Sequence, residues 1–220
     1  MKIFLDTADV GQIEEVSRWG ILDGVTTNPS HVSKTGADPA TLFPRICGLV
    51  KGPVSLEAIG LEADGIIKEG RELAKIAQNV VVKVPGTKEG LIAVKALSGE
   101  KIKTNVTAVF SPLQALLAAK AGAAYVSPFV GRLDSIGQTG MDLVRQIRQI
   151  YGNYGLKTEI IVAAIRHPHH VLEAALAGAD ICTMYYEILT QLYDHPSTDL
   201  VIQQFLKDWA KVPGGKKIAH

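Results

Sequence analysis

A lysine stands among four valines near the middle of the chain. Residues 79–85 read Asn-Val-Val-Val-Lys-Val-Pro, with Lys83 as the single charged residue. A β-branched run of this kind is typical of a strand buried on both faces. Lysine is almost never buried without a partner or a function, and burial disfavours its charged form. Lys83 is therefore a candidate amine nucleophile that would form a Schiff base with a carbonyl group. From this segment alone, a strand-end lysine that reaches water or pairs with a carboxylate is the alternative.

Polar side chains also stand at the ends of other apolar segments. Each closes or follows a short run with the composition of a buried strand. They are Asp6, Asn28, Glu57, Asn105, Thr107, Ser127, Arg132 and Arg166. If these segments are parallel strands of one sheet, their carboxyl ends meet, and so many polar groups would be costly to bury unless they were paired. Because titratable residues cluster at functional sites, this convergence favours a functional role for the lysine.

The composition of this set predicts its chemistry. Lys83 would supply the nucleophile, while Asp6 and Glu57 in different environments would divide acid and base work. Arg132 and Arg166 would hold a phosphate through paired hydrogen bonds. The amides and hydroxyls suit a substrate rich in hydroxyl groups, so the set predicts a Schiff-base enzyme that acts on a sugar phosphate. Surface salt bridges or helix-end contacts are the alternative for the arginines, and a counter-ion role is the alternative for Asp6.

Short apolar strands alternate with helical patterns along the chain. We expect strands at 2–7, 24–29, 53–59, the lysine segment, 103–109, 125–130, 159–165 and 180–184. We expect helices at 9–19, 39–50, 63–77, 87–97, 112–121, 141–151, 168–177, 186–193 and 198–211. Alternation of this kind predicts a parallel sheet with right-handed crossovers.

The number of repeats selects the architecture. Eight strand–helix repeats in 220 residues predict a single-domain (β/α)₈ barrel over residues 1–220, with an extra C-terminal helix. A doubly wound open sheet is the alternative, but Thr7-Ala8-Asp9 after the first strand is not the glycine-rich phosphate loop of that fold. In a barrel the catalytic groups lie at the carboxyl ends of the strands, where the polar residues fall. Residues 213–217, Pro-Gly-Gly-Lys-Lys, are expected to fray.

Composition and charge argue against some classes of binding partner and cellular location. The formal net charge is +1 and neither sign forms a block, which argues against nucleic acid or an anionic membrane surface as the main partner. Residues 1–30 lack a signal-peptide pattern and no apolar run is long enough to span a bilayer, so we expect a cytoplasmic protein. Cys47 and Cys182 are then expected to be buried, reduced thiols.

A histidine cluster, His167-Pro168-His169-His170, follows the seventh strand. Histidine is a frequent zinc ligand, but no cysteine or acidic residue follows at a metal-binding spacing. Pro168 suits the first turn of a helix. We therefore expect a structural role at a helix start rather than a metal site.

Four motifs carry a resemblance to a known family. They are Gly-Val-Thr-Thr-Asn-Pro at 24–29, Val-Val-Lys-Val-Pro at 81–85, Ser-Pro-Phe-Val-Gly-Arg-Leu-Asp at 127–134 and Ile-Arg-His-Pro at 165–168. With them the chain resembles the short transaldolases, whose family also contains the fructose-6-phosphate aldolases. The resemblance implies transfer of a dihydroxyacetone unit between sugar phosphates in the pentose phosphate pathway. The usual substrates are sedoheptulose 7-phosphate and glyceraldehyde 3-phosphate, and the products are erythrose 4-phosphate and fructose 6-phosphate.

The resemblance implies catalytic roles for four residues. Lys83 is the Schiff-base lysine. Glu57 moves protons during carbinolamine dehydration, through a water held with Thr107. Asp6 removes the hydroxyl proton that starts carbon–carbon cleavage. No metal or organic cofactor is expected, because the iminium ion itself accepts the electrons.

The resemblance also implies roles in substrate binding. Asn28, Asn105 and Ser127 hold the three-carbon enamine. Arg132 and Arg166 bind the phosphate group. The partners expected are therefore phosphorylated sugars.

Two positions separate the branches of the family. The aldolase branch carries glutamine and tyrosine where this chain has Glu57 and Phe129. A tyrosine hydroxyl beside the enamine can help to protonate it and release free dihydroxyacetone, whereas phenylalanine cannot. The resemblance therefore favours a transaldolase. An aldolase is the alternative, and a barrel that binds sugar phosphates without turnover is an alternative of another class.

The chain departs from the family pattern at two positions. Ala164 stands where the family usually has a serine that helps to bind phosphate, and Tyr185 stands where it usually has a proline. A hydrogen bond to a charged group is worth about 1.5–3 kcal/mol. We therefore expect phosphate affinity to be weakened roughly tenfold or more, unless a backbone amide or a water replaces the hydroxyl.

The resemblance also implies assembly. The family forms rings, often stacked pentamers, so a homo-oligomer (pentamer or decamer) is expected. The predicted helix 198–211 carries enough apolar residues to dock on a neighbouring subunit. They are Leu200, Ile202, Phe205, Leu206 and Trp209.

Overall fold

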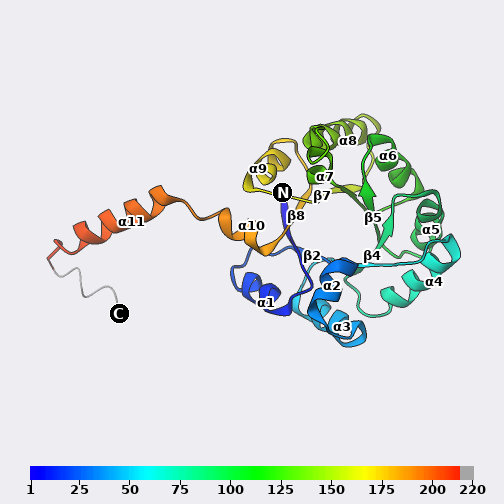
Figure 1. Cartoon of the computed structure of the whole chain (residues 1–220), viewed down its shortest axis with the longest axis horizontal. Helices are drawn as coiled ribbons and strands as arrows, with labels where there is room; N and C mark the ends of the chain where they lie inside the picture. The colour runs from blue at the N-terminus through cyan, green and yellow to red at the C-terminus, as the bar shows by residue number, and fades with distance from the viewer. Residues whose placement is uncertain (214–220) are drawn as a thin grey trace.

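Eight parallel strands close into a barrel in a computed structural model that describes residues 1–213. The strands follow one another round the ring in chain order, and β8 pairs with β1 to close it (Figure 1). They are β1 (Lys2–Asp6), β2 (Gly24–Thr26), β3 (Val54–Glu57), β4 (Val80–Pro85), β5 (Thr104–Val109), β6 (Tyr125–Pro128), β7 (Glu159–Val162) and β8 (Ile181–Met184). This confirms the predicted (β/α)₈ barrel and excludes the open sheet.

Helices follow the strands and lie around the ring, except α11, which projects away from it (Figure 1). They are α1 (Val10–Arg18), α2 (Pro29–Thr35), α3 (Pro39–Leu49), α4 (Ala63–Ala74), α5 (Lys88–Gly99), α6 (Pro112–Ala121), α7 (Val130–Asp134), α8 (Gly140–Tyr154), α9 (Pro168–Leu176), α10 (Tyr186–Gln191) and α11 (Pro196–Trp209). Several begin at the residues whose side chains cap them. Thr87 accepts a hydrogen bond from the amide of Gly90, and Ser111 forms a reciprocal pair with Gln114 ahead of Pro112.

Two short helices were missed by the sequence patterns. The predicted strand 24–29 ends at Thr26, because Asn28 caps α2 and Pro29 takes its first turn. The predicted strand 125–130 ends at Pro128, and α7 follows at Val130. Helices of seven and five residues show too little periodicity to be read from the sequence. Both lie at the carboxyl ends of strands, which is where they affect the site.

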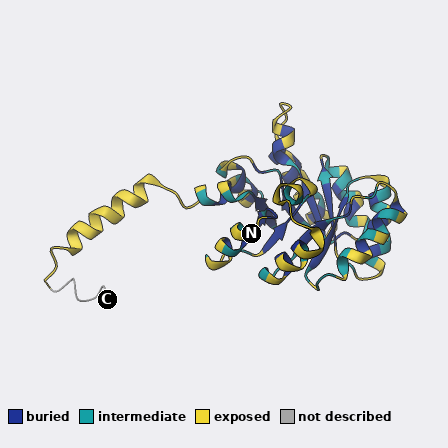
Figure 2. Ribbon diagram, turned by 60° about the horizontal axis from the view of Figure 1, so that its bottom comes forward, coloured by how far each residue is buried: buried dark blue, intermediate teal, exposed yellow. Residues whose placement is uncertain are grey.

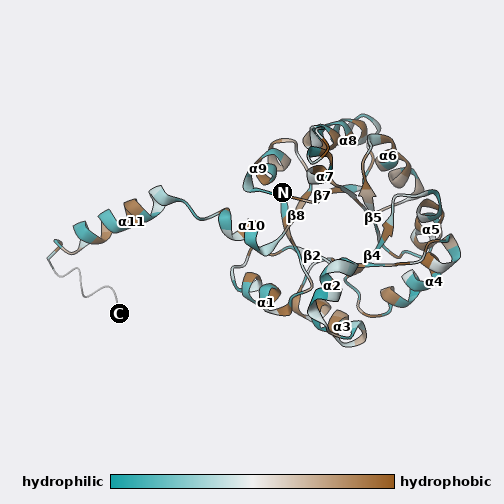
Figure 3. Ribbon diagram, viewed as in Figure 1, coloured by the Kyte–Doolittle hydropathy of each residue, from teal (hydrophilic) through white to brown (hydrophobic). Residues whose placement is uncertain are grey.

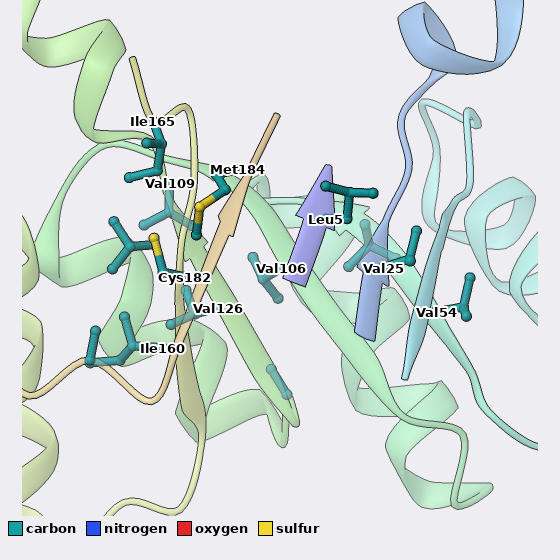
Figure 4. Close-up of a cluster of buried hydrophobic side chains, with 14 of the residues drawn as sticks. Leu5, Val25, Val54, Val106, Val109, Val126, Ile160, Ile165, Cys182 and Met184 are labelled. Carbon is teal, nitrogen blue, oxygen red and sulfur yellow. The ribbon is translucent and has the colours of Figure 1, made fainter. Parts of the chain in front are cut away.

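The strands bury one apolar layer on each side. Side chains alternate between the two faces of a strand, so residues that face the helices pack in a large outer core. Leu5, Val25, Val106 and Val126 belong to it (Figure 4). Residues of the opposite parity fill the interior of the barrel with a smaller cluster. It consists of Phe4, Val81, Tyr125, Ile161 and Ile181.

The two cysteines lie in the outer core. Cys47 and Cys182 are buried and unpaired, as expected. Burial raises the pKa of the Cys47 thiol to about 11 and that of Cys182 to about 12. Both thiols are therefore protonated at neutral pH and are poor nucleophiles.

The last helix leaves the barrel. Helix α11 extends away from the ring, and every described residue from 191 onward is exposed (Figures 1 and 2). It begins at Pro196, two residues before the predicted start, because the side chain of His195 accepts a hydrogen bond from the amide of Ser197. Hydrophobic and hydrophilic residues alternate along this helix (Figure 3). The hydrophobic ones are exposed, with Phe205 at 67%.

None of the helices in the described part of the chain has the length and apolar character needed to cross a bilayer. Of the predicted frayed end at 213–217, residues 214–217 lie outside the described residues.

Candidate active site

A cavity of about 340 Å³ opens at the carboxyl ends of the strands. Nine of the ten residues expected at the site line it. They are Asp6, Asn28, Glu57, Lys83, Thr107, Ser127, Phe129, Arg132 and Arg166. The barrel thus brings together side chains from seven of its eight strand–loop segments, because parallel strands all end at the same rim. The tenth residue, Asn105, is fully buried and does not line the cavity.

Lys83 is buried on β4, where only 5% of its surface is exposed. Its Nζ lies 3.1 Å from Oε2 of Glu57 and donates a hydrogen bond of 3.0 Å to the carbonyl oxygen of Thr27. The register of β3 against β4 sets Glu57 directly beside Lys83. The lysine is therefore both buried and paired with a carboxylate. Proton exchange between the two groups needs no movement of the backbone.

Asp6 belongs to a separate hydrogen-bond chain. The hydroxyl of Thr26 donates to Oδ1 of Asp6 over 2.8 Å, and the hydroxyls of Thr26 and Thr183 lie 2.7 Å apart. A hydroxyl has one proton, so Thr183 must donate to Thr26. Among the described residues Lys83 forms its ion pair with Glu57 and none with Asp6, so the counter-ion role considered for Asp6 belongs to Glu57.

Thr107 offers a hydroxyl without a partner. Its Oγ1 is buried and makes no hydrogen bond with any described residue. The register of β5 against β6 shifts between Val106 and Val109, and Ala108 has a left-handed φ of 55°. Such a bulge re-aims a side chain, and left-handed alanines are uncommon outside functional sites. The unpartnered hydroxyl at the cavity wall is therefore free to bind a water or a substrate.

Asn105 lies below the cavity and supports it. The hydroxyl of Ser127 donates to Oδ1 of Asn105 over 2.8 Å, and Nδ2 of Asn105 donates to the hydroxyl of Ser55 over 3.2 Å. Asn105 thus fixes the orientation of Ser127. Asn28 is placed differently: its Oδ1 accepts from the amide of His31 over 2.9 Å. The amide NH₂ group of Asn28 therefore remains able to donate a hydrogen bond to a substrate in the cavity.

Two guanidinium groups stand at the rim. Arg132 lies on α7 and Arg166 in the loop after β7, and both are exposed at the cavity edge. Neither side chain forms an ion pair or hydrogen bond with a described residue, so the salt-bridge alternative does not hold for them. A Cβ on Gly131 would overlap the carbonyl oxygen of Ala164 and Cγ of Arg166. The absence of a side chain at Gly131 therefore allows α7 to lie against the loop that carries the second arginine.

The histidine cluster fixes that loop. His167 caps α9 and its Nδ1 accepts from the amide of His170, which confirms the expected structural role. The buried imidazole of His170 in turn accepts from the amide of Arg166 at Nδ1 and lies 3.0 Å from Asp134 at Nε2. Burial lowers the pKa of His170, and His167 adds to the effect. His170 thus donates to Asp134 as a neutral ring.

The cavity is also lined by residues that the sequence patterns did not single out, and three of them carry polar side chains that matter here. His31 and Lys34 lie on α2, the helix that was missed, and Thr183 lies on β8. Tyr185 was noted as a departure from the family, and it also lines the cavity. Among the described residues, no group of three or more His, Cys, Asp or Glu is arranged to hold a metal ion.

Fold and cavity together place the chain among the (β/α)₈ barrels that carry a buried lysine in a polar cavity at the carboxyl rim. Residues 3–214 match the sequence model described as Transaldolase/Fructose-6-phosphate aldolase, and the chain belongs to this family.

Curated relatives match over nearly their whole length. A probable transaldolase from Aquifex aeolicus is 61% identical over 97% of this chain and 98% of its own. One from Dictyoglomus turgidum is 57% identical over 97% of this chain and 100% of its own, and one from Methanococcus maripaludis strain C5 is 59% identical over 95% and 97%.

A solved structure resembles the chain in fold alone. The carboxyl transferase domain of Rhizobium etli pyruvate carboxylase, with 3-bromopyruvate, is matched with a TM-score of 0.64 and 13% identity. The match covers 84% of this chain and 39% of that one.

Proposed function

We propose that this protein is a transaldolase of the pentose phosphate pathway. It transfers a dihydroxyacetone unit from sedoheptulose 7-phosphate to glyceraldehyde 3-phosphate and gives erythrose 4-phosphate and fructose 6-phosphate. The observation that carries the proposal is the buried amine of Lys83, 3.1 Å from Glu57 at the base of a cavity with two unpaired arginines at its rim. The high identity to probable transaldolases supports the same reaction.

The first step forms the Schiff base. The ammonium of Lys83 gives a proton to Glu57, and the resulting amine attacks the ketone carbon of the donor sugar. The carbinolamine then loses water, for which Glu57 returns the proton to the leaving hydroxyl. A water bound to the unpartnered hydroxyl of Thr107 would relay protons between these groups. The product is an iminium ion, which accepts the electron pair released in the next step.

The second step breaks the carbon–carbon bond. Asp6 takes the proton of the C4 hydroxyl while the C3–C4 bond breaks, and the electron pair of that bond moves into the enamine. Asn28 and Ser127, with Asn105 behind Ser127, hold the three-carbon enamine on Lys83. When the acceptor aldehyde arrives, the enamine carbon attacks it and Asp6 returns the proton to the new hydroxyl.

The arginine pair selects phosphorylated substrates. Guanidinium groups bind phosphate through charge-assisted paired hydrogen bonds, and Arg132 and Arg166 have no competing protein partner among the described residues. Ala164 stands beside them without a hydroxyl, with a left-handed φ of 58°. We therefore expect phosphate to be held mainly by the arginines and by backbone amides of this loop.

Borohydride trapping tests the proposal directly. The protein is incubated with fructose 6-phosphate and reduced with borohydride, and the modified residue is located by peptide mass spectrometry. We expect a stable mass increase on Lys83 and on no other lysine, with Lys95 as the exposed-lysine control. Absence of the adduct in the presence of bound substrate would support a barrel that binds sugar phosphates without turnover.

The aldolase branch is the second candidate, and Phe129 argues against it. Its ring lies at the cavity wall and packs edge-on against Phe110, with the ring centroids 5.8 Å apart. It offers no hydroxyl to protonate the enamine, so the enamine persists until an acceptor aldehyde enters. Cleavage of fructose 6-phosphate that is as fast without an acceptor as with one would favour the aldolase.

We also infer that the protein works as a homo-oligomer in which α11 docks on a neighbouring copy. Burying a helix such as α11 removes a large apolar area from water, which is the usual driving force of association. Its exposed residues at helical spacing include Ile202, Phe205 and Leu206. Light scattering should give a mass of several subunits, a pentamer or decamer, and removal of residues 196–220 should give a smaller species. A monomeric full-length chain would contradict this.

The cellular location we infer is the cytoplasm. Two buried, unpaired cysteines fit a reducing compartment. Sugar phosphates, the substrates proposed here, carry charges that keep them from crossing membranes. Fractionation of the producing cells, with a periplasmic or secreted marker as control, tests the inference.

A further inference from the structure

One nitrogen at the edge of the site has no hydrogen-bond partner. Nε2 of His31 is buried and makes no hydrogen bond with any described residue. It lies 3.5 Å from Oδ2 of Asp6. An unsatisfied buried donor costs roughly as much as a lost hydrogen bond, so such an atom is expected to acquire a partner in the working state of the protein.

Asp6 offers the matching acceptor. Its Oδ1 already accepts from Thr26 over 2.8 Å, whereas Oδ2 faces His31. A hydrogen bond between the imidazole and the carboxylate requires a separation of about 2.7–3.2 Å, so the two groups need to approach by only a few tenths of an ångström. Catalytic hydrogen bonds are often long in the absence of substrate and tighten in the complex.

The packing around His31 restricts the orientation of its ring. Its ring packs edge-on against Tyr185, with the ring centroids 5.5 Å apart and an angle of 74° between the planes. The two rings also stand between the main cavity and a second one of about 310 Å³, since both residues line both cavities. Nε2 itself is buried, and its polar neighbour among the described residues is Oδ2 of Asp6.

We propose that His31, held by Tyr185, positions the catalytic carboxylate of Asp6. This rests on the function proposed above. Thr26 and His31 donate to different oxygens of Asp6 and so fix the plane of the carboxylate, which leaves its remaining lone pairs directed at the C4 hydroxyl. During cleavage Asp6 takes the hydroxyl proton while the electrons of the C3–C4 bond enter the enamine. His31 keeps its own proton throughout.

The inference predicts an effect on bond cleavage but not on Schiff-base formation. Lys83 and Glu57 form a pair that does not include His31. Loss of the His31 donor should therefore leave attack on the ketone unchanged and slow only the step in which Asp6 acts. An ordinary packing role for His31 would instead change stability, with both chemical steps altered together or not at all.

The test uses His31→Phe, which keeps a ring against Tyr185 but removes the donor, and His31→Gln, whose amide restores one. His169→Phe is the matched control, because His169 is exposed and lies outside the cavity. For each full-length variant, kcat and KM are measured for transfer from fructose 6-phosphate to erythrose 4-phosphate. The fraction of Lys83 trapped by borohydride and the melting temperature are measured alongside.

We expect His31→Phe to lower kcat by roughly tenfold to a hundredfold, the effect of one hydrogen bond to a charged group, while KM and the trapped fraction stay within about twofold. His31→Gln should recover most of kcat, and the control should match the wild type. Tyr185→Ala should lower kcat in the same direction by releasing the imidazole.

Several outcomes would overturn the inference. They are an unchanged kcat in His31→Phe, a change confined to KM, or a glutamine variant no better than the phenylalanine variant at equal folded fraction. A wild-type protein that is not trapped at Lys83 would instead refute the proposed function itself. The two failures are therefore distinguishable.

Discussion

Two successive layers of the barrel interior have opposite character although the same strands supply them. The lower layer contains Phe4 and Val81, and the upper layer contains Asp6 and Lys83, two residues further along β1 and β4. All four side chains point inward, since side chains on one face of a strand recur every second residue. The lower layer is a dry apolar plug, whereas the upper layer is polar and lines the cavity.

The contrast between the two layers explains how the fold accommodates the buried Lys83. The apolar layer fills the barrel interior below the site, and charged groups beside it interact at reduced dielectric. Two carboxylates, Glu57 and Asp6, then satisfy separate networks, one with Lys83 and one with Thr26. On the proposed function the lower layer provides stability and the upper layer chemistry, and substitutions should separate the two properties.

The largest contrast is expected between Lys83→Met and Val81→Ala. The first removes the amine, so transfer activity and borohydride trapping should be lost while the barrel stays folded, because methionine fits the apolar stem of lysine. The second leaves a cavity in the plug and should cost about 1–3 kcal/mol of unfolding free energy while activity persists. Assays and denaturant unfolding measure both. Loss of folding in Lys83→Met together with loss of activity in Val81→Ala would contradict the division.

The next largest effect is expected at the rim. Arg166→Met should raise KM for fructose 6-phosphate roughly tenfold to a hundredfold, because a charge-assisted contact with phosphate is lost, with a smaller change in kcat. Initial-rate kinetics check this. Arg145→Met is the control, since that exposed arginine pairs with Asp142 and Glu173 outside the cavity. Equal KM values for the Arg166 variant and the wild type would place the phosphate elsewhere.

A moderate effect is expected from Phe129→Tyr. The added hydroxyl would stand beside the enamine and help to protonate it, so release of free dihydroxyacetone from fructose 6-phosphate should rise several-fold in the absence of an acceptor. A coupled assay for dihydroxyacetone measures the rate. Phe110→Tyr, which alters the ring partner of Phe129, serves as the control. An unchanged acceptor-free rate would show that Phe129 does not separate the two branches.

The effect with the least bearing on activity is expected at His170, where stability depends on pH. Its pKa is lowered in the fold, so the unfolded chain binds the proton more readily and the stability due to the neutral ring is lost as pH falls below about 6.5. The melting temperature of the wild type should therefore fall more than that of His170→Asn between about pH 7.5 and about pH 5.5. The variant itself should cost about 1–3 kcal/mol at neutral pH, because the amide of Arg166 and Asp134 lose their partner. Parallel pH dependences would contradict this account.

Much of the barrel and its rim followed from the sequence. Strands such as β4 are short β-branched runs, and their polar ends locate the rim that carries the cavity once the strands are parallel. The depth of each residue did not follow. Asn105 pairs in register with Lys83, yet Lys83 lines the cavity and Asn105 is fully buried, which no local pattern predicts.

Two of the residues that were missed share a physical reason. His31 and Lys34 lie on a seven-residue helix that begins with a proline, and so short a helix leaves no periodic signal. The sequence predicted part of the role of His170, because Pro168 indicated that a helix starts at the histidine cluster. The hydrogen bond from the amide of Arg166 to that imidazole is a tertiary contact that no local pattern encodes.

The hydroxyl chain from Thr183 through Thr26 to Asp6 joins the last strand of the ring to its first two. A growing polypeptide emerges from its amino terminus, so Asp6 and its direct donor Thr26 are made early, whereas Thr183, which completes the chain of hydroxyls, is made 157 residues after Thr26. The lysine and its glutamate belong to neighbouring strands and can meet well before then. On the proposed mechanism, a chain that ends before β8 has the pair of Lys83 and Glu57 but lacks the hydroxyl of Thr183 behind Thr26 and Asp6, so full turnover requires the closed ring.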